Sequence, residues 1–236
     1  MTWKAKRFWK TATAEPCDGG FTVRLDQRPV KTPGKEPLIV PTLAMAEAIA
    51  AEWDAQQGPL RPETMPVTRA ANSALEKVAP QFAEVVGLLA AYGASDLLCY
   101  RATGPADLIA RQAAAWDPLL HWAATALNAP LLVTSGIVPI DQPAASTSRL
   151  HDLTAALSPF QIAALHDLVA ISGSLVLAFA VTEGRLTPSE AWILSRIDEA
   201  YQAELWGADD EALALAATKQ RDLVQAATFW ALCAAK

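Results

Sequence analysis

The sequence predicts an α+β protein of two domains, in which a small N-terminal antiparallel β domain with a covering helix precedes a larger all-α helical bundle. Three observations lead to this fold class. Apolar and polar residues alternate over residues 21–25, as in a half-buried strand. Pro59, Pro62 and Pro66 make residues 58–66 an irregular connector, and helical periodicity follows it. We therefore expect domains at 1–66 and 67–236, with the junction between Gly58 and Arg69.

The N-terminal domain is expected to be a meander of three short strands covered by one helix. The strands are expected at residues 21–25, 30–32 and 38–40, with turns at 26–29 and 33–34. Thr42 is expected to cap a helix that runs to about Gln57. The helix covers the sheet with an apolar stripe made of Leu43, Ala46, Ala50 and Trp53. Trp53 therefore receives a structural role.

The C-terminal domain is read as helical from its periodicity and capping signals. Outside the central stretch, helices are expected at residues 68–78, 80–92, 105–127, 143–157, 188–206 and 209–233. Residues 131–134 (LLVT) carry a short strand signal inside this helical region. The sequence leaves open whether that strand returns to the N-terminal sheet.

The central stretch, residues 168–181, is apolar on every side of a helix, so it is expected to be buried. It is shorter than the roughly 20 residues that span a membrane. Residues 158–161 and 187–190 are capping boxes that open helices. Gly173 is expected to separate two helices and to allow close packing. A nucleophile turn at residues 172–174 is disfavoured, because no strand precedes it.

The acidic composition limits the partners that the chain could have. A formal net charge of −6 and a pI near 5.1 argue against nucleic acid and against an anionic membrane surface. Cys17, Cys99 and Cys233 lie far apart and are expected to be reduced thiols. The N-terminal residues MTWKAKRFWK lack the apolar core of a secretory signal. A cytoplasmic bacterial protein, monomeric and without cofactor, is expected.

Catalytic signatures are absent from the sequence: it contains no GxGxxG, GxxxxGK[ST], GxSxG or HExxH motif. Two pairs, His151-Asp152 and His166-Asp167, resemble ligands of a metal-dependent phosphohydrolase. Together with the acids at 209–211 they define an alternative, a small metal-dependent hydrolase. A position at helix surfaces or ends explains the pairs better, and acids in a first turn are expected from the helix dipole. We therefore expect no metal site.

The helix expected at 188–206 carries the candidate partner-binding residues. Its predicted buried stripe is Ile193, Leu194, Ile197, Tyr201 and Leu205. Its predicted opposite face holds Trp192, Glu199, Gln202 and Trp206. Tryptophan is enriched at binding hot spots, so this face is a candidate for partner binding, although the next helix could equally cover it. Glu190 is either a further partner contact or only the fourth residue of its capping box.

Several sequence blocks resemble one known family. They are RFWK (7–10), FTVRLDQRPVKTP (21–33), IAAEWDAQ (49–56), MPVT (65–68), GSLVLAFAV (173–181), EGRLTPSEAW (183–192) and YQAELWG (201–207). Together they resemble the assembly chaperones dedicated to the α subunit of the F-type ATP synthase catalytic head, over nearly the whole chain. This sequence departs from the family pattern at Gln27, where glycine is commoner, and at Glu76, where aspartate is expected.

The resemblance implies a function without enzymatic activity. Members of the family are thought to hold a free α subunit, without ATP, and to prevent its aggregation until a β subunit replaces the chaperone. It also implies an N-terminal β-containing domain and a C-terminal helical domain, with Glu190 matching a functional acidic position. Eukaryotic relatives are expected in the mitochondrial matrix. A permanent structural subunit is a further possibility, which differs from a chaperone in that its partner is not released.

Overall fold

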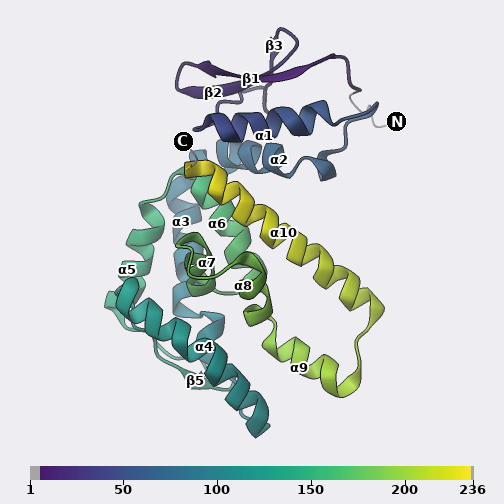
Figure 1. Cartoon of the computed structure of the whole chain (residues 1–236). Coiled ribbons are helices and arrows are strands. Elements are labelled where there is room, and N and C mark those ends of the chain that lie inside the picture. The colour runs from purple at the N-terminus through teal and green to yellow at the C-terminus, as the bar shows by residue number, and fades with distance from the viewer. Residues whose placement is uncertain (1–5, 235–236) are drawn as a thin grey trace. The chain divides into compact units, whose positions relative to one another are not determined.

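The computed structural model describes residues 6–234, and the predicted α+β fold class is confirmed (Figure 1). The chain forms two compact units. Unit 1 comprises the chain up to Phe82, Pro159–Ala164 and the chain from Thr228 onward. Unit 2 comprises Ala83–Ser158 and Leu165–Ala227. Whether residues 1–66 and 67–236 are independent domains stays a prediction.

The sheet of unit 1 is antiparallel, in the order β1-β2-β3. Its strands are β1 (Ala12–Cys17), β2 (Gly20–Leu25) and β3 (Arg28–Pro29). β1 was not among the expected strands, because its two alanines and its proline carry little β propensity. The expected strand at 38–40 contributes a single bridge, from Val40 to Phe21. At the β2–β3 turn, Asp26 rather than Gln27 takes a positive φ, of 55°.

One helix, α1 (Leu43–Asp54), covers the sheet and contacts both β1 and β2 (Figure 1). The predicted cap is confirmed, because the Thr42 hydroxyl accepts a hydrogen bond from the Met45 N–H at 3.2 Å. The predicted stripe is shifted: Met45, Ala46, Ile49 and Ala50 are buried, whereas Leu43 is 40% exposed. Leu43 is the first residue of the helix, ahead of the turn that packs on the sheet.

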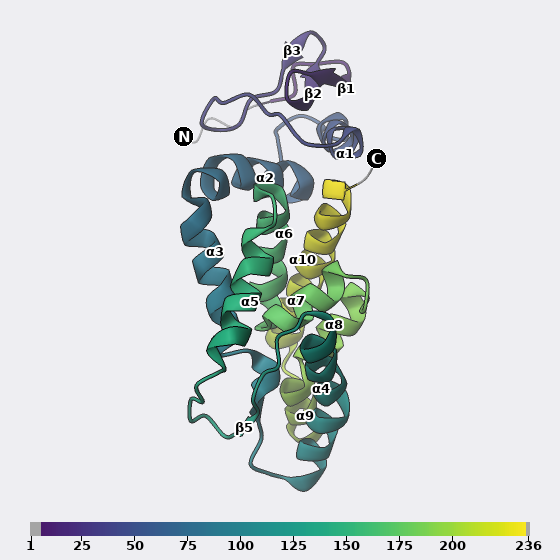
Figure 2. The ribbon, with the colours of Figure 1, turned by 90° about the vertical axis from the view of Figure 1, so that its left-hand side faces the viewer.

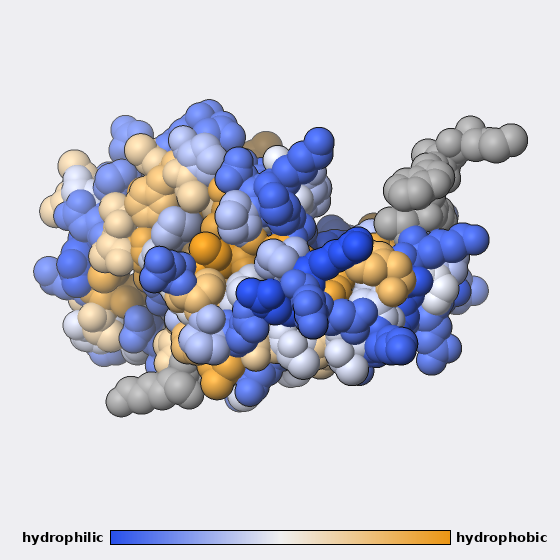
Figure 3. Space-filling view, turned by 90° about the horizontal axis from the view of Figure 1, so that it is seen from above, coloured by the Kyte–Doolittle hydropathy of each residue, from blue (hydrophilic) through white to orange (hydrophobic). Residues whose placement is uncertain are grey.

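The strand face of unit 1 is mainly hydrophilic, with apolar patches between charged side chains (Figure 3). Phe8 is 63% exposed there, and the Arg28 guanidinium lies 5.6 Å from its ring centroid.

Two helices follow the connector, α2 (Pro66–Ser73) and α3 (Phe82–Ala90), with a π-helical turn at Ala74–Val78 between them. Among the described residues, the helical stretch Pro66–Cys99 is long and apolar enough to cross a membrane. Core helices of soluble proteins meet the same criteria of length and composition.

The remaining helices belong largely to unit 2. They are α4 (Ala106–Ala126), α5 (Ala144–Ala155), α6 (Pro159–Ser172), α7 (Leu175–Thr182), α8 (Pro188–Ser195), α9 (Ile197–Trp206) and α10 (Asp210–Ala234). α7 is the buried helix of this unit, in contact with α4 and α8 (Figure 2). The expected break at Gly173 is confirmed, because this residue takes a φ of +73° that favours glycine.

A buried carboxylate fixes the start of α7. Asp96 is fully buried and accepts hydrogen bonds from the Ser174 hydroxyl at 2.7 Å and the Val176 N–H at 3.0 Å. It also accepts one from the Leu98 N–H at 3.0 Å. Burial raises the pKa of Asp96, and these hydrogen bonds oppose the shift. Asp96 therefore joins the turn at Leu97–Cys99 to the N-terminus of the central helix.

The strand signal at 131–134 corresponds to β5 (Thr134–Ser135), which pairs in parallel with β4 (Tyr100–Arg101). This pair forms a separate two-stranded sheet. The strand therefore does not return to the N-terminal sheet.

The single helix expected at 188–206 is wrong, because the chain breaks at Arg196 into α8 and α9. The Ser195 hydroxyl donates a hydrogen bond to the Trp192 carbonyl at 2.8 Å, which competes with regular helical bonding. Arg196 then takes a φ of −120° and a ψ of 21°. The break changes the helical phase, so residues before and after it no longer share the predicted faces.

Candidate functional site

Several of the family-like blocks meet within unit 1. The Arg7 guanidinium of the RFWK block donates to the Gln56 carbonyl at 2.9 Å and to the Asp54 carboxylate at 2.9 Å. It also donates to the carbonyls of Asp54, Trp9 and Lys10. A cation at the C-terminal end of α1 is favoured by the helix dipole. The RFWK block therefore anchors the chain to the end of α1.

The same helix holds the MPVT block. The Glu52 carboxylate accepts hydrogen bonds from the N–H groups of Val67 at 2.7 Å and Thr68 at 2.8 Å, and from the Thr68 hydroxyl at 2.7 Å. Burial raises the pKa of Glu52, and these bonds oppose the shift. The carboxylate therefore caps the first turn of α2. Glu76 likewise accepts a hydrogen bond from the Gly34 N–H. These residues therefore stabilise the fold of unit 1.

Glu190 takes the capping position that the sequence indicates. Its carboxylate accepts hydrogen bonds from the Thr187 N–H at 2.7 Å and the Thr187 hydroxyl at 2.8 Å. The Glu190 N–H in turn donates to the Thr187 hydroxyl at 3.2 Å. The bonds from Thr187 lower the pKa of Glu190. The side chain is exposed, but both of its known contacts serve the cap. Partner binding by Glu190 stays a prediction.

α9 lies along α4 through polar contacts (Figure 2). The Tyr201 hydroxyl lies 2.9 Å from both carboxylate oxygens of Asp107. The Arg111 guanidinium pairs with Glu204 at 2.7 Å and lies 5.2 Å from the Tyr201 ring centroid. The buried Gln112 amide donates to Asp198 at 2.7 Å. These bonds orient α9, so its opposite face points to solvent.

The predicted face is only partly correct. Glu199, Gln202 and Trp206 are exposed as expected, with Trp206 at 78%. Trp192 is instead buried, at 9% exposure, with the Arg196 guanidinium 5.4 Å from its ring centroid. Its placement beside the other three residues is wrong, because the break at Arg196 rotates α8 relative to α9.

The predicted buried stripe also needs correction. Tyr201 is buried and Leu194 and Ile197 are half-buried. Ile193 and Leu205 are 65% and 56% exposed, so the prediction was wrong for both. Glu199 does not stand alone, because its carboxylate pairs with Arg196 at 2.6 Å.

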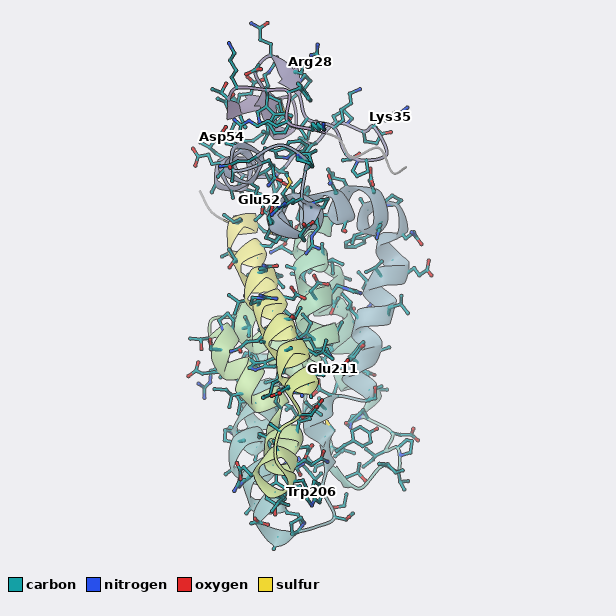
Figure 4. All side chains as sticks on the ribbon, turned by 90° about the vertical axis from the view of Figure 1, so that its right-hand side faces the viewer. Arg28, Lys35, Glu52, Asp54, Trp206 and Glu211 are labelled. Carbon is teal, nitrogen blue, oxygen red and sulfur yellow. The ribbon has the colours of Figure 1, made fainter. Side chains whose placement is uncertain are left out.

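Sequence reasoning predicted Trp206 as a partner contact but missed the exposed leucines on either side of the turn between α9 and α10. Leu205 and Trp206 end α9, while Leu213 and Leu215 of α10 are 54% and 57% exposed. We name these four residues the α9–α10 corner. Figure 4 marks Trp206 near the end of α9 and Glu211 near the start of α10. Residues 197–218 contain six Asp and Glu and no Lys or Arg. The corner is therefore apolar with acidic surroundings. Its sequence signal is the stretch ALAL (212–215) directly after three acidic residues. In the structure every residue from 210 to 215 is exposed.

The His-Asp pairs stay at the surface. His166 Nδ1 lies 2.9 Å from the Asp167 carboxylate, and His151 Nδ1 lies 3.6 Å from that of Asp152. The hydrogen bond that the His166 ring donates to the Asp167 carboxylate raises the pKa of His166. Within residues 6–234, no group of three or more His, Cys, Asp or Glu side chains could hold a metal ion. The alternative hydrolase therefore lacks the convergent site that it requires there.

Known proteins resemble the chain over most of its length. The sequence model of the ATP12 chaperone protein family matches residues 6–124. The crystal structure of Atp12 from Paracoccus denitrificans is 50% identical, with a TM-score of 0.95, and the match covers 97% of this chain and 98% of that one. The Atu1473 protein from Agrobacterium tumefaciens is 40% identical, with a TM-score of 0.92, over 96% of this chain and 85% of that one.

A curated eukaryotic relative extends the comparison. The mitochondrial protein atp12 of Schizosaccharomyces pombe is 24% identical over 219 residues, which are 88% of this chain and 75% of that protein. Sequence and fold together define an assembly chaperone. The chain belongs to the ATP12 chaperone family, so the predicted relationship to ATP synthase assembly chaperones is confirmed.

Proposed function

We propose that this chaperone binds the free α subunit of the F-type ATP synthase catalytic head and prevents its aggregation until the β subunit pairs with it. Membership of the ATP12 family supports a role in ATP synthase assembly. The choice of the α subunit rests on the sequence blocks that resemble chaperones dedicated to that subunit. Binding requires no ATP and no cofactor, and the chain acts by covering a surface rather than by catalysis.

The α9–α10 corner is the observation that carries this proposal. Trp206 at 78% exposure and three exposed leucines are large apolar side chains on the two sides of the loop that joins α9 to α10. Exposed apolar groups of this kind mark interaction sites, and tryptophan is enriched at binding hot spots. Glu199 and Gln202 lie on the same helix and would form a polar rim. Trp192 is left out of the contact surface because it is buried.

The acidic surroundings favour a client surface with basic residues beside its apolar ones. Complementary charges at a rim speed association and make it sensitive to salt. A free subunit exposes an apolar surface that its partner later covers, and such surfaces aggregate. The α9–α10 corner would cover the apolar surface of the α subunit reversibly, and the β subunit would then take its place. This exchange accounts for both the holding and the release of the α subunit. Release also distinguishes a chaperone from a permanent structural subunit.

A pull-down from a bacterial lysate with mass-spectrometric identification of the bound protein tests the partner. We expect the α subunit to be enriched over the β subunit. Light scattering of diluted free α subunit should fall when the chaperone is present and stay low without ATP. Enrichment of another subunit in place of α would refute the choice of client. A monomeric, cytoplasmic chaperone is expected, as for a bacterial relative of a mitochondrial protein.

A further inference from the structure

The segment 130–140 of unit 2 displays a second apolar surface. Between α4 and α5, Leu132 and Val133 are 48% and 45% exposed, and Ile137 and Val138 are 94% and 68% exposed. No Asp, Glu, Lys or Arg occurs between Asp117 and Asp141. This surface is therefore apolar and uncharged, in contrast to the acidic α9–α10 corner.

The hydrogen bonds that hold the backbone of this segment, within residues 6–234, lie along one side of it. The Gln142 side-chain amide bonds to both the N–H and the C=O of Leu132, at 2.8 and 2.9 Å. The Gly136 N–H donates to the Arg101 carbonyl at 2.8 Å, beside the pairing of β5 with β4. The Gln142 side chain thus makes the two hydrogen bonds to Leu132 that a neighbouring strand would otherwise make. The segment is held extended while its apolar side chains face solvent.

The opposite side of the segment is an open strand edge. Backbone groups of an extended chain alternate between its two sides, so Val133 and Ser135 point away from Gln142 and β4. No hydrogen bond from the described part of the chain reaches the N–H or C=O groups of these two residues. Native proteins usually protect such edges with charges, prolines or a covering element. Here the edge carries none of the charges that would discourage another strand.

We infer that this edge is a docking site at which an extended, uncharged apolar segment of the client adds as a strand. This inference rests on the proposed function. Unpaired main-chain groups supply the hydrogen bonds of strand addition, and the flanking side chains supply apolar contacts. Leu132, Val133, Ile137 and Val138 would give those contacts.

The negative charge of unit 2 favours a segment of the client at this edge over a second copy of the chain or an anionic membrane. Unit 2 contains seven Lys and Arg against sixteen Asp and Glu, so a second copy of the chain and an anionic membrane are both repelled. A free subunit that has not yet met its partner offers extended apolar segments that need cover. The chaperone therefore has two surfaces of different chemistry, one acidic and one uncharged.

NMR amide exchange of the full chain tests the inference with two probes, the free α subunit and a short end-capped peptide of alternating valine and threonine. We expect each probe to protect the amides of Val133 and Ser135. Val133→Pro removes the outward N–H, whereas Val133→Ala removes only the side chain beyond Cβ. The proline variant should lose the peptide's protection of Ser135 and bind the α subunit about tenfold more weakly, which corresponds to about 1.4 kcal/mol. The alanine variant should keep the protection.

The outcomes separate this inference from the proposed function. Protection by the peptide without any binding of the α subunit supports the edge and refutes the proposed client. If the α subunit binds but leaves both amides unprotected, the edge is not the docking site. A proline variant that binds the α subunit like wild type leads to the same conclusion. Protection that arises from dimerisation, detected by sedimentation of the chaperone alone, also overturns the inference. Unchanged thermal unfolding of the variants is the control for folding, and Ile137→Ser with Val138→Ser replaces the proline variant if that variant unfolds.

Discussion

The indole rings of Trp9 and Trp53 pack edge to face, with ring centroids 5.3 Å apart. This contact joins the RFWK block to the EWDAQ block, although 43 residues separate the two tryptophans. Trp9 is 4% exposed, and the Arg7 guanidinium lies 5.5 Å from its ring centroid. The ring of Phe8 adds a second edge-to-face contact to Trp9, at 5.2 Å. An aromatic cluster therefore ties the N-terminal segment to α1.

Trp53→Arg should strongly destabilise the protein, as the structural role of Trp53 implies. The change removes the contact with Trp9 and places a charge beside a largely apolar cluster. Loss of a large aromatic typically costs about 3–5 kcal/mol, and the lower end applies because Trp53 is only half-buried. Urea unfolding measures the change, with Trp53→Phe as the conservative control. A Trp53→Arg variant that melts within about a degree of wild type would show that the ring is not structural.

Asp96→Ala should destabilise the protein by about 3 kcal/mol, because it leaves three buried donors without an acceptor. Asp96→Asn keeps one carbonyl oxygen as an acceptor and should therefore lose less stability than Asp96→Ala. Asp152 is exposed, so Asp152→Ala is the matched control and should unfold like wild type. Denaturant titration followed by circular dichroism gives the comparison. Equal stability of Asp96→Ala and Asp152→Ala would contradict the role assigned to the buried carboxylate.

Local signals in the sequence predicted much of this fold. Capping by Thr42 and Thr187 and the break at Gly173 depend on a few neighbouring residues, so the sequence specifies them directly. The break at Arg196 was not predictable in the same way, because neither glycine nor proline marks it. The Ser195 hydroxyl bonds to the Trp192 carbonyl, and serine does this in only some helices.

The candidate site was harder to predict than the fold. Exposure depends on which other segments cover a helix, and periodicity alone does not report that. Trp192 and Trp206 looked equivalent on a continuous helix, yet one is buried and the other is 78% exposed. Asp96 gave no sequence signal either, because its partners Ser174 and Val176 lie far along the chain.

The capping box at Thr187 should give α8 a pH-dependent stability. The pKa of Glu190 is lowered in the folded state by the hydrogen bonds from Thr187. The stabilisation is therefore present above the unfolded pKa of about 4.3 and is lost as pH falls through the lower pKa of the folded state. Wild type should melt above Glu190→Gln at neutral pH, and the two should converge below about pH 4. A difference that persists unchanged at low pH would show that the carboxylate charge does not matter.

Thr187→Ala separates the cap from the acid. It removes the hydroxyl that accepts from the Glu190 N–H, but it keeps the Glu190 carboxylate. If Thr187→Ala and Glu190→Gln reduce client holding equally, capping explains the effect of Glu190. A loss confined to Glu190→Gln supports a direct contact with the client.

Tyr201→Phe should loosen α9 without unfolding unit 2. The change removes the hydroxyl that bonds to Asp107 and keeps the ring under the Arg111 guanidinium. We expect faster amide exchange in α9 and unchanged exchange in α7. Raised salt should speed exchange in α9 of the wild type as well, because the Arg111–Glu204 pair is exposed and screened. Exchange that rises equally in α7 would indicate global destabilisation instead.

Trp206→Ala should weaken holding of the free α subunit more than Glu199→Gln does. A desolvated tryptophan anchor typically costs about 2 kcal/mol or more on truncation, whereas a rim carboxylate mainly changes the association rate and its salt dependence. Trp206 is 78% exposed in the free chain, so its removal should leave folding intact. Leu88→Ala is the matched control, since Leu88 is a large apolar residue of 64% exposure on α3. Light scattering and titration with the α subunit should rank Trp206→Ala below Glu199→Gln, with Leu88→Ala near wild type. If Trp206→Ala and Glu199→Gln both suppress aggregation as well as wild type, the α9–α10 corner is not the docking surface.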